Sequence, residues 1–534
     1  MCQSPVATTS STTIDCHPPP LPLRQLLSNL FLSKPSDAGA DESPSFLFRP
    51  NPAPSTTLHE AQSLLSISLP LVLTSLLLYS RSIISMLFLG RLGALPLAGG
   101  SLAIGFANIT GYSVLSGLAA GMDPICSQSH GSGRPHLLSS ALRRTVLLLL
   151  AASLPISLLW LSIRRLLVLA GQDPAIAAAA HSFIIFSLPD LILQSLLHPI
   201  RIFLRSQSIT LPLTASAAVA AALHLPINLL LVSHLRLGVP GVALSSVLTN
   251  FNVLLLLILY LRRRFSGLLI TTSATKAAAD DGHQWRSLLA LAIPSCFSIC
   301  LEWWWYEIMV LLSGLLLHPQ PTVASMGLLI QTTSLIYIFP HSLSAAVSTR
   351  VGNELGANRP ESARRAARVG LACGALLGFA AFYFSFAVRN VWARIFTADA
   401  AIAVLTSSVL PILGLCELGN CPQTTGCGVL RGSARPRVGA NINLGSFYGV
   451  GMPVGVGLAF WSGLDFKGLW LGLLFAQATC LVLMLVVIGR TDWALQAGRA
   501  QCLTGRAEGL GEEKDGENIK LIGIIVEPCK NDQA

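Results

Sequence analysis

The sequence is poor in charge and lacks the motifs of several large protein classes. Only 11% of its 534 residues are charged and 52% are hydrophobic, whereas soluble domains carry roughly 25% charged residues. The sequence contains no phosphate-binding G-x-x-x-x-G-K-[ST] loop, so we do not expect the chain to hydrolyse ATP. Its twelve cysteines include no C-x-x-C pair, which argues against a zinc or haem site. Since no catalytic constellation is visible either, we expect a membrane protein that is not an enzyme and carries no cofactor.

Long apolar segments occupy most of the chain. Segments of about 20 apolar residues cross a bilayer as helices, because lipid offers no partner to an unpaired backbone group. The short alternating segments of a β-barrel are absent from the sequence. The pattern therefore predicts an all-α membrane protein with twelve transmembrane helices, at 62–88, 95–120, 145–168, 176–198, 208–232, 239–261, 287–312, 321–346, 369–388, 402–425, 438–461 and 467–489.

The two halves of the chain repeat each other. The stretch Gly131-Ser-Gly-Arg-Pro135 returns as Gly356-Ala-Asn-Arg-Pro360, an offset of 225 residues. Upstream, an offset of 224 pairs Pro70 with Pro294, and downstream the offset grows to 227. Duplicated halves in a membrane protein indicate a transporter that works by alternating access, with its substrate site between the two halves.

The distribution of basic residues predicts the orientation. With the N-terminus in the cytoplasm, the inside loops hold more than twice as many Arg and Lys residues as the outside loops, so both termini should be cytoplasmic. These loops also explain the net charge of +10 without a nucleic-acid partner. We predict a disordered N-terminal tail (1–58), an N-lobe (59–262), a cytoplasmic loop (263–285), a C-lobe (286–490) and a polar C-terminal tail (491–534).

The seventh span holds the clearest candidates for a functional site. Glu302 and Glu307 lie within its apolar stretch, and burial disfavours the charged form of a carboxyl group, so either can carry a proton. They are about 140° apart on a helix, which favours Glu302 as the cavity-facing group and Glu307 as its partner. Trp303, Trp304 and Tyr306 are candidates for an aromatic wall around an organic substrate. The alternative for each of these residues is plain packing.

The tenth span offers a second polar group. Glu417, Asn420 and Gln423 follow at i, i+3 and i+6 and so lie roughly along one face, with Pro422 interrupting the helix between them. In the first span, Arg81 is an isolated cation. It either pairs with a carboxylate of the other half or takes part in a local structural contact.

Three stretches resemble the multidrug and toxic compound extrusion (MATE) family, in particular its plant DETOXIFICATION branch. They are Ser348-Thr-Arg-Val-Gly-Asn-Glu-Leu-Gly-Ala-Asn358, Leu301-Glu-Trp-Trp-Trp-Tyr-Glu307 and Pro422-Gln-Thr-Thr-Gly-Cys-Gly-Val-Leu-Arg-Gly432. The resemblance covers about 60–490. It implies twelve helices in two pseudo-symmetric six-helix lobes that form a V, and antiport of organic compounds against protons or sodium ions.

The resemblance also implies roles for single residues. Glu302 matches the carboxylate that eukaryotic members use in the C-lobe, and Glu307 matches the second acid of that motif. Many bacterial members have an Asp where this chain has Ser85, and many eukaryotic members have an acid where it has Asn420. Glu417, one turn earlier, is a candidate replacement. These departures favour a proton site centred on Glu302 and weaken a sodium site, which would need more oxygen ligands.

The sequence thus predicts a proton-driven exporter of small organic compounds, such as xenobiotics, secondary metabolites or a hormone. We expect a monomer in a plasma, vacuolar, Golgi or endosomal membrane. The alternatives are a lipid-linked precursor flippase of the same superfamily and a scaffold or sensor that transports nothing. Further candidates have structural or gating roles, several of them in the arginine-rich stretch 348–368 after the eighth span: Pro294, Pro422, Arg350, Gly352, Asn353, Glu354 and Gly356.

Overall fold

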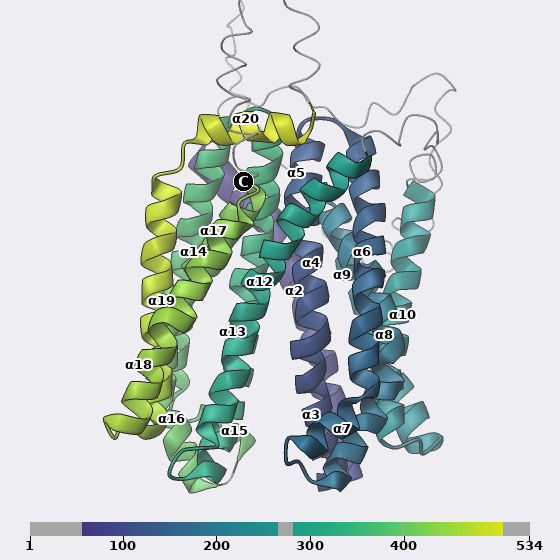
Figure 1. The fold of residues 1–534 in the computed structure, drawn as a ribbon, viewed down its shortest axis with the longest axis vertical. Coiled ribbons are helices and arrows are strands. Elements are labelled where there is room, and N and C mark those ends of the chain that lie inside the picture. Colours follow the sequence, from purple (N-terminus) through teal and green to yellow (C-terminus); the bar gives the residue numbers. More distant parts are fainter. Residues whose placement is uncertain (1–55, 265–280, 398, 506–534) are drawn as a thin grey trace, which may run out of the picture. The chain divides into compact units, whose positions relative to one another are not determined.

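The fold is that of a computed structural model, which describes residues 56–264, 281–397 and 399–505. Twelve of its helices are long and apolar enough to cross a membrane. Within the described ranges every regular element is helical (Figure 1). The predicted fold class, an all-α membrane protein of twelve spans in two six-helix lobes, is therefore confirmed. The predicted N-terminal tail lies outside the described residues except for 56–58.

The six spans of the N-lobe begin with α2. Four of them are single helices: α2 (Thr57–Leu92), α6 (Pro135–Leu161), α8 (Pro174–Ser206) and α10 (Val239–Arg264). The second span consists of α3 (Ala94–Ala107), η1 (Asn108–Tyr112), α4 (Ser113–Ala120) and α5 (Met122–Gly131). The fifth span consists of α9 (Leu211–Asn228) and η2 (Leu229–His234). The segments labelled η are π-helical turns within a span.

The C-lobe repeats this arrangement. Five of its spans are single helices: α12 (Asp281–Ser313), α13 (Pro319–Gly356), α14 (Pro360–Val388), α16 (Ala400–Gly432) and α19 (Asp465–Gly489). The eleventh span of the chain consists of α17 (Pro436–Asn443), η3 (Leu444–Gly451), α18 (Met452–Val456) and η4 (Gly457–Trp461). Three short helices complete the described fold: α7 (Ile163–Leu169), α15 (Trp392–Phe396) and α20 (Trp493–Leu503).

The repeat is visible in the helix caps. Asp173 accepts hydrogen bonds from the backbone amides that begin α8, and Asp399, its repeat partner at an offset of 226, does the same for α16. A carboxylate at this position satisfies amides that have no partner inside the helix and interacts favourably with the helix dipole. The same local chemistry therefore starts the fourth span of each lobe.

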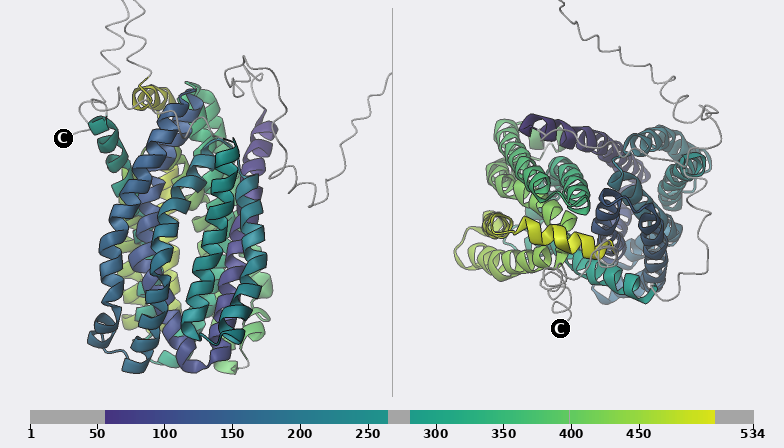
Figure 2. Two further views of the ribbon diagram at one scale, coloured as in Figure 1. Left: turned by 90° about the vertical axis from the view of Figure 1, so that its right-hand side faces the viewer. Right: turned by 90° about the horizontal axis from the view of Figure 1, so that it is seen from above.

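The structure places three helix boundaries differently from the prediction. The third span was placed at 145–168, but α6 runs over Pro135–Leu161 and the separate α7 follows it. The loop predicted over 263–285 ends earlier, because α12 begins at Asp281. The C-terminal tail predicted over 491–534 begins with α20, whose Trp493, Ala497 and Ala500 are buried. This helix lies across the ends of α13 and α14 (Figures 1 and 2).

The first helix of each half begins in the core of the opposite lobe. Leu64 of α2 belongs to a buried cluster made mostly of C-lobe residues, whereas Phe88 of the same helix belongs to the N-lobe cluster. Leu288 of α12, the repeat partner of Leu64, is buried in the N-lobe cluster. Pro70 and Pro294 lie just after these leucines, where a proline allows a helix to bend. In Figure 1, α12 accordingly runs obliquely from beside α5 towards α13.

The two lobes meet backbone to backbone where α5 packs against α13. A methyl group added at Gly131 would lie 2.0 Å from the carbonyl oxygen of Asn353, and one added at Gly356 would lie 2.0 Å from that of Gln128. Gln128 and Asn353 are themselves repeat partners at an offset of 225, so the contact is reciprocal. Only glycine permits so close an approach. This contact lies at the end of the helices that α20 covers, called here the α20 end.

We expect Gly356→Ala to weaken this contact between the lobes. Because the new methyl group would meet backbone rather than a flexible side chain, the thermal unfolding midpoint of the purified protein should fall by about 3 °C or more. Gly327→Ala in the same helix is the matched control, since a methyl group there meets nothing within 4 Å. A midpoint for Gly356→Ala equal to that of Gly327→Ala would contradict the proposed steric role.

Candidate functional site

A buried and a half-buried carboxylate approach each other inside the C-lobe. Glu417 of α16 is 1% exposed, and its Oε2 accepts a hydrogen bond from Asn420 Nδ2 at 2.8 Å. Glu302 of α12 is half-buried, and the Tyr337 hydroxyl of α13 is close enough to interact with it electrostatically. The two carboxylates are close enough to interact electrostatically, and Tyr306 interacts with both. Residues from three spans therefore meet around one acidic pair.

The polar face of α16 continues from this pair into a network of amides. Gln423 Nε2 donates to Asn443 Oδ1 at 3.4 Å, and Asn443 Nδ2 donates to Ser298 Oγ of α12 at 3.1 Å. Gln477 of α19 donates to Asn420 Oδ1 at 3.4 Å. Buried polar groups are costly unless they are paired, so this network fixes α16 against α12, α17 and α19.

The aromatic residues of α12 point in different directions. Trp303 is half-buried, whereas Trp304 is 40% exposed and donates to the carbonyl of Ile109 in the N-lobe at 3.2 Å. Trp305 is buried in the C-lobe core, with its ring 5.6 Å from that of Phe447. Only Tyr306 of the predicted aromatic wall interacts with the carboxylate pair. The substrate-lining role of Trp303 and Trp304 stays a prediction.

The predicted partner of Glu302 is not brought to this pair. Glu307 is half-buried and forms no ion pair or hydrogen bond within the described ranges. Tyr337, which the sequence analysis did not single out, takes the place beside Glu302. The sequence shows Tyr337 only as a phenol within an apolar span. Its position along that span does not reveal that it faces α12. Pro422, as expected, lies inside α16 next to the amide network.

The N-lobe contains a second polar network that sequence reasoning missed. Asp190 of α8 accepts hydrogen bonds from Tyr112 at 2.8 Å and from Asn250 of α10 at 2.6 Å. Arg81 of α2 donates to Asn250 Oδ1 at 2.5 Å. Of the two alternatives for Arg81, the structure therefore supports the local contact, because its partners belong to the same lobe. Asp190, an acid within an apolar span, was the signal available in the sequence.

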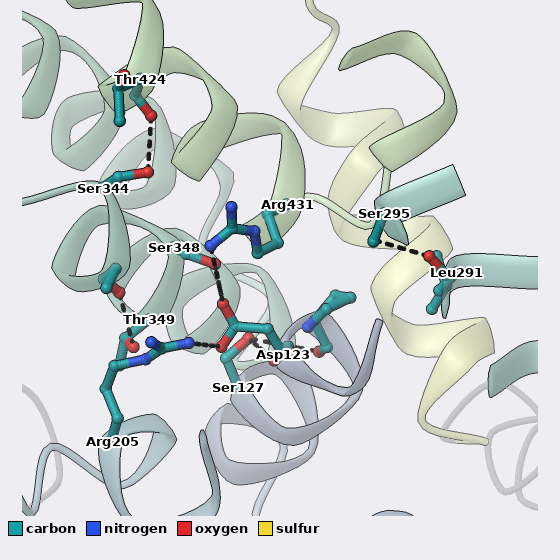
Figure 3. Close-up of polar contacts among 12 residues, drawn as sticks. Asp123, Ser127, Arg205, Leu291, Ser295, Ser344, Ser348, Thr349, Thr424 and Arg431 are labelled. Carbon is teal, nitrogen blue, oxygen red and sulfur yellow. Dashed lines mark hydrogen bonds and ion pairs between the residues drawn. The ribbon is translucent and has the colours of Figure 1, made fainter. Parts of the chain in front are cut away.

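At the α20 end, a buried carboxylate bridges the two lobes (Figure 3). Asp123 of α5 is fully buried and forms an ion pair with Arg205 of α8 at 2.8 Å. Across the interface, it accepts a hydrogen bond from Ser348 of α13 at 2.9 Å and lies 4.0 Å from Arg431 of α16. Two arginines from opposite lobes thus share one carboxylate.

This arrangement follows the repeat. Ser348 is the partner of Asp123 at an offset of 225, and Arg431 is the partner of Arg205 at an offset of 226. The four residues therefore surround the pseudo-two-fold axis that relates the lobes. The symmetry is broken only where aspartate in one copy corresponds to serine in the other.

A second ion pair at the α20 end joins α2 to α13. Arg350 binds the buried Glu60 in a bidentate manner, at 2.9 and 3.0 Å, and also pairs with Glu354 at 3.0 Å. Gly352 packs against Ser127, and Asn353 faces the backbone of α5. The predicted gating stretch thus contacts the N-lobe at this end through Arg350, Gly352 and Gly356. Bidentate arginine–carboxylate pairs are among the stronger polar contacts in proteins.

Comparison with known proteins identifies the family. The MatE family model matches the chain twice, over residues 70–230 and 294–456. The chain belongs to the MATE transporter family. The two matched segments coincide with the two copies of the repeat, so each lobe is one copy of the family unit. The resemblance seen in the three sequence motifs is confirmed.

The relatives are plant MATE proteins. Protein DETOXIFICATION 49 of Arabidopsis thaliana is 64% identical over 480 residues, which cover 89% of this chain and 95% of the relative. Protein DETOXIFICATION 51 of the same plant is 56% identical over 456 residues, covering 85% of each chain. The chain is thus a multi-pass membrane transporter, similar to these proteins along nearly its whole length.

Solved structures of MATE transporters share the fold. The crystal structure of the eukaryotic MATE transporter AtDTX14 superposes with a TM-score of 0.79 at 31% identity, covering 83% of this chain and 99% of that chain. The bent form of the Vibrio cholerae MATE transporter VcmN gives a TM-score of 0.71 at 16% identity, covering 84% and 99%. The second likeness concerns the fold alone.

We expect Asp123→Asn to loosen the α20 end of this MATE protein. The substitution keeps the shape of the side chain but leaves Arg205 and Arg431 without their carboxylate, and breaking a buried ion pair costs about 3–5 kcal/mol. Cys126, fully buried one turn further along α5, is a natural reporter. Its modification by N-ethylmaleimide, followed by peptide mass spectrometry, should become at least about tenfold faster.

Glu361→Gln serves as the control for that measurement. Glu361 is 75% exposed and pairs only loosely with Arg364, at 3.9 Å, and exposed pairs contribute little to stability. Its loss should leave the labelling rate of Cys126 unchanged. Equal rates in wild type, Asp123→Asn and Glu361→Gln would show that the shared carboxylate does not hold the lobes together.

Proposed function

We propose that this MATE protein exports small organic compounds in exchange for protons, and that the pair Glu302 and Glu417 carries the coupling proton. The observation that supports this most directly is the acidic pair itself. Within the described ranges neither carboxylate forms an ion pair with a basic side chain. Two carboxylates within interaction range resist simultaneous ionisation, because like charges disfavour each other in a poorly solvated site.

The surrounding hydrogen bonds suit a group that gains and loses a proton. Asn420 donates to Glu417, so the charged form of this carboxylate has a donor, and the Tyr337 hydroxyl, which can donate, lies close to Glu302. Tyr337 can also accept a hydrogen bond, as a phenol does, and therefore remains a partner when Glu302 is protonated. Because Glu302 belongs to α12 and Tyr337 to α13, a change of protonation at Glu302 alters a contact between helices.

In the proposed cycle, protonation and substrate release are linked. When the site is open to the acidic side, a proton binds at the pair, rearranges the contacts of α12 with α13 and α16, and expels the substrate. Opening to the cytoplasm releases the proton and restores affinity for substrate. Thermodynamic linkage requires that proton and substrate weaken each other's binding by the same factor. For that opening, the contact of α5 with α13 has to separate, which makes the α20 end the cytoplasmic gate in this proposal.

The remaining assignments are part of the same proposal. Both termini lie in the cytoplasm, and the protein acts as a monomeric carrier rather than an enzyme. The word detoxification in the names of these relatives supports transport of harmful compounds.

The test is transport by the reconstituted full-length protein with and without an imposed pH gradient. Two probes are used, the organic cation ethidium and the permanently charged anion 2-naphthalenesulfonate. We expect gradient-driven uptake of at least one probe, reduced about tenfold or more in Glu302→Gln and in Glu417→Gln, because an amide cannot release a proton. Exchange of the same probe without a gradient should persist in both variants, which distinguishes loss of coupling from loss of folding.

Glu307→Gln and the exposed Glu361→Gln are the matched controls. Both remove a carboxylate that is not part of the pair, so gradient-driven uptake should stay within about twofold of wild type. The proposal is overturned if both Glu302→Gln and Glu417→Gln retain wild-type gradient-driven uptake.

A further inference from the structure

One face of α12 follows the second span of the N-lobe, although α12 belongs to the C-lobe in sequence (Figure 1). Every fourth residue of α12 meets every fourth residue of that span, in the opposite order. The four contacts join Ala292 to Gly121, Cys296 to Gly117, Cys300 to Ser113 and Trp304 to Ile109. Residues four apart lie on the same face of a helix. The contacts therefore form one antiparallel line between the two spans, called here the α4–α12 seam.

Two thiols lie next to each other in the middle of this seam. The sulfur atoms of Cys296 and Cys300 are 3.8 Å apart. On the N-lobe side, Cys296 Sγ lies 3.8 Å from the carbonyl oxygen of Val114, and Cys300 Sγ lies 3.7 Å from Ser113 Oγ. Neither cysteine is in a disulfide, and Cys296 is half-buried whereas Cys300 is 4% exposed. The pair is thus a closely spaced dithiol that faces the opposite lobe.

The scaffold itself does not require these thiols. At the repeat offset of 224 residues, Val72 and Leu76 of α2 correspond to Cys296 and Cys300, so the first copy of the repeat builds the same helix with aliphatic side chains. A single buried cysteine acts as a small apolar residue. Two thiols in contact have a further property, because they can bind one soft atom together.

The spacing of the pair suits a shared ligand atom better than a disulfide. A disulfide needs β-carbons about 3.5–4.5 Å apart, whereas residues four apart on a helix place theirs about 5–6 Å apart. The helix would therefore have to deform before the two sulfurs could bond to each other. With bonds of about 2.3 Å, as thiolates form to zinc, sulfurs 3.8 Å apart would subtend an angle of about 110° at one bridging atom. A bridging atom therefore fits the helix as it stands.

The surroundings of the pair select the kind of bridging atom. A structural zinc ion takes four protein ligands, and the part of the chain that the structure describes contains no group of three or more His, Cys, Asp or Glu residues able to hold a metal ion. A trivalent arsenical needs only two protein ligands, because arsenic brings its third substituent with it. It is also uncharged, which suits a site within a membrane-spanning helix, where charge is costly.

We propose that Cys296 and Cys300 form a binding site for trivalent arsenicals within the α4–α12 seam. An organic arsenic oxide, R–As=O, reacts there with both thiols. Two As–S bonds form, the As=O bond breaks, and the oxygen leaves as water together with the two thiol protons. Arsenic stays trivalent, so the reaction consumes no oxidant or reductant. The site is separate from the acidic pair and does not depend on the proposed exchange of protons.

The seam leaves no room for the organic group of a bound arsenical. A methyl group added at Gly117 would lie 2.6 Å from the α-carbon of Cys296, and one added at Gly121 would lie 2.3 Å from that of Ala292. Because packed helices offer few voids, an arsenical at the pair has to displace α4 from α12. In this proposal a bound arsenical therefore keeps the two lobes apart along the seam.

The test is binding of phenylarsine oxide to the purified full-length protein in millimolar glutathione. Glutathione removes arsenic from single cysteines, whereas a second thiol of the protein competes with it at a high effective concentration. We expect wild type to retain one phenylarsenic group per chain, measured as intact-protein mass, and 2,3-dimercaptopropanol to remove it. Peptide mass mapping of wild type should place the arsenic on the segment that contains both Cys296 and Cys300.

Cysteine variants identify the two ligands. Cys296→Ala and Cys300→Ala should each raise the half-saturating concentration of phenylarsine oxide at least about tenfold, because one thiol cannot form the chelate. Cys300→Ala combined with Leu301→Cys keeps the number of thiols but places the second one about 140° from Cys296 around the helix, so it should bind equally poorly. Cys373→Ala removes a half-buried cysteine of α14 and should leave binding within about twofold of wild type.

Two results on wild type would overturn the proposal: loss of the phenylarsenic group in glutathione, and arsenic mapped to other cysteines. Binding as tight as that of wild type in either Cys296→Ala or Cys300→Ala would also contradict it. Since the mapping uses wild type, a variant that fails to fold leaves this part of the test intact.

Discussion

The close contact between α5 and α13 is the constraint on which the rest of the structure depends. Two glycines allow the backbones to touch, and one buried carboxylate neutralises an arginine from each lobe at the same place. The first helices reinforce this junction, because each begins in the opposite core. Interfaces of this kind are either packed or separated, with little in between. The junction at the α20 end therefore joins two lobes that each contain buried cores of their own.

The two lobes share a fold but differ in chemistry. In the C-lobe, the polar residues of α16 lie around two carboxylates that form no ion pair among the described residues, although Arg431 interacts electrostatically with Glu302. In the N-lobe, the corresponding helix α8 carries Asp190 and Arg201, and α2 adds Arg81. Duplication thus supplied two equivalent scaffolds, and substitutions at a few buried positions made one acidic and the other basic.

The transmembrane spans and part of the polar site could be predicted from the sequence, because a membrane-spanning helix requires a long run of apolar residues. Hydropathy predicted the twelve spans, and the spacing of Glu417, Asn420 and Gln423 predicted one buried face. The α20 helix was missed because its eleven residues are too few to cross a membrane, although Asp492 caps it and Trp493, Ala497 and Ala500 follow a helical period. Partners such as Tyr337 and Glu302 come from different spans, and no local spacing encodes that pairing. Asp190 was visible as an acid in an apolar segment and Asp123 as an acid just after one, but their partners depend on how the spans pack.

In a dimer of identical subunits, a residue beside the two-fold axis faces the same residue of the other subunit. Only residue types that can contact a copy of themselves are therefore favourable at such a position. Two aspartates at the position of Asp123 and Ser348 would repel each other across a hydrogen-bond distance, and two serines would leave both neighbouring arginines without a counter-charge. A dimer of identical six-helix subunits could build neither arrangement without cost. Fusion of the two copies into one chain removed this restriction, because each copy could then mutate separately. The single aspartate at the axis is a contact that only the fused, diverged protein can form.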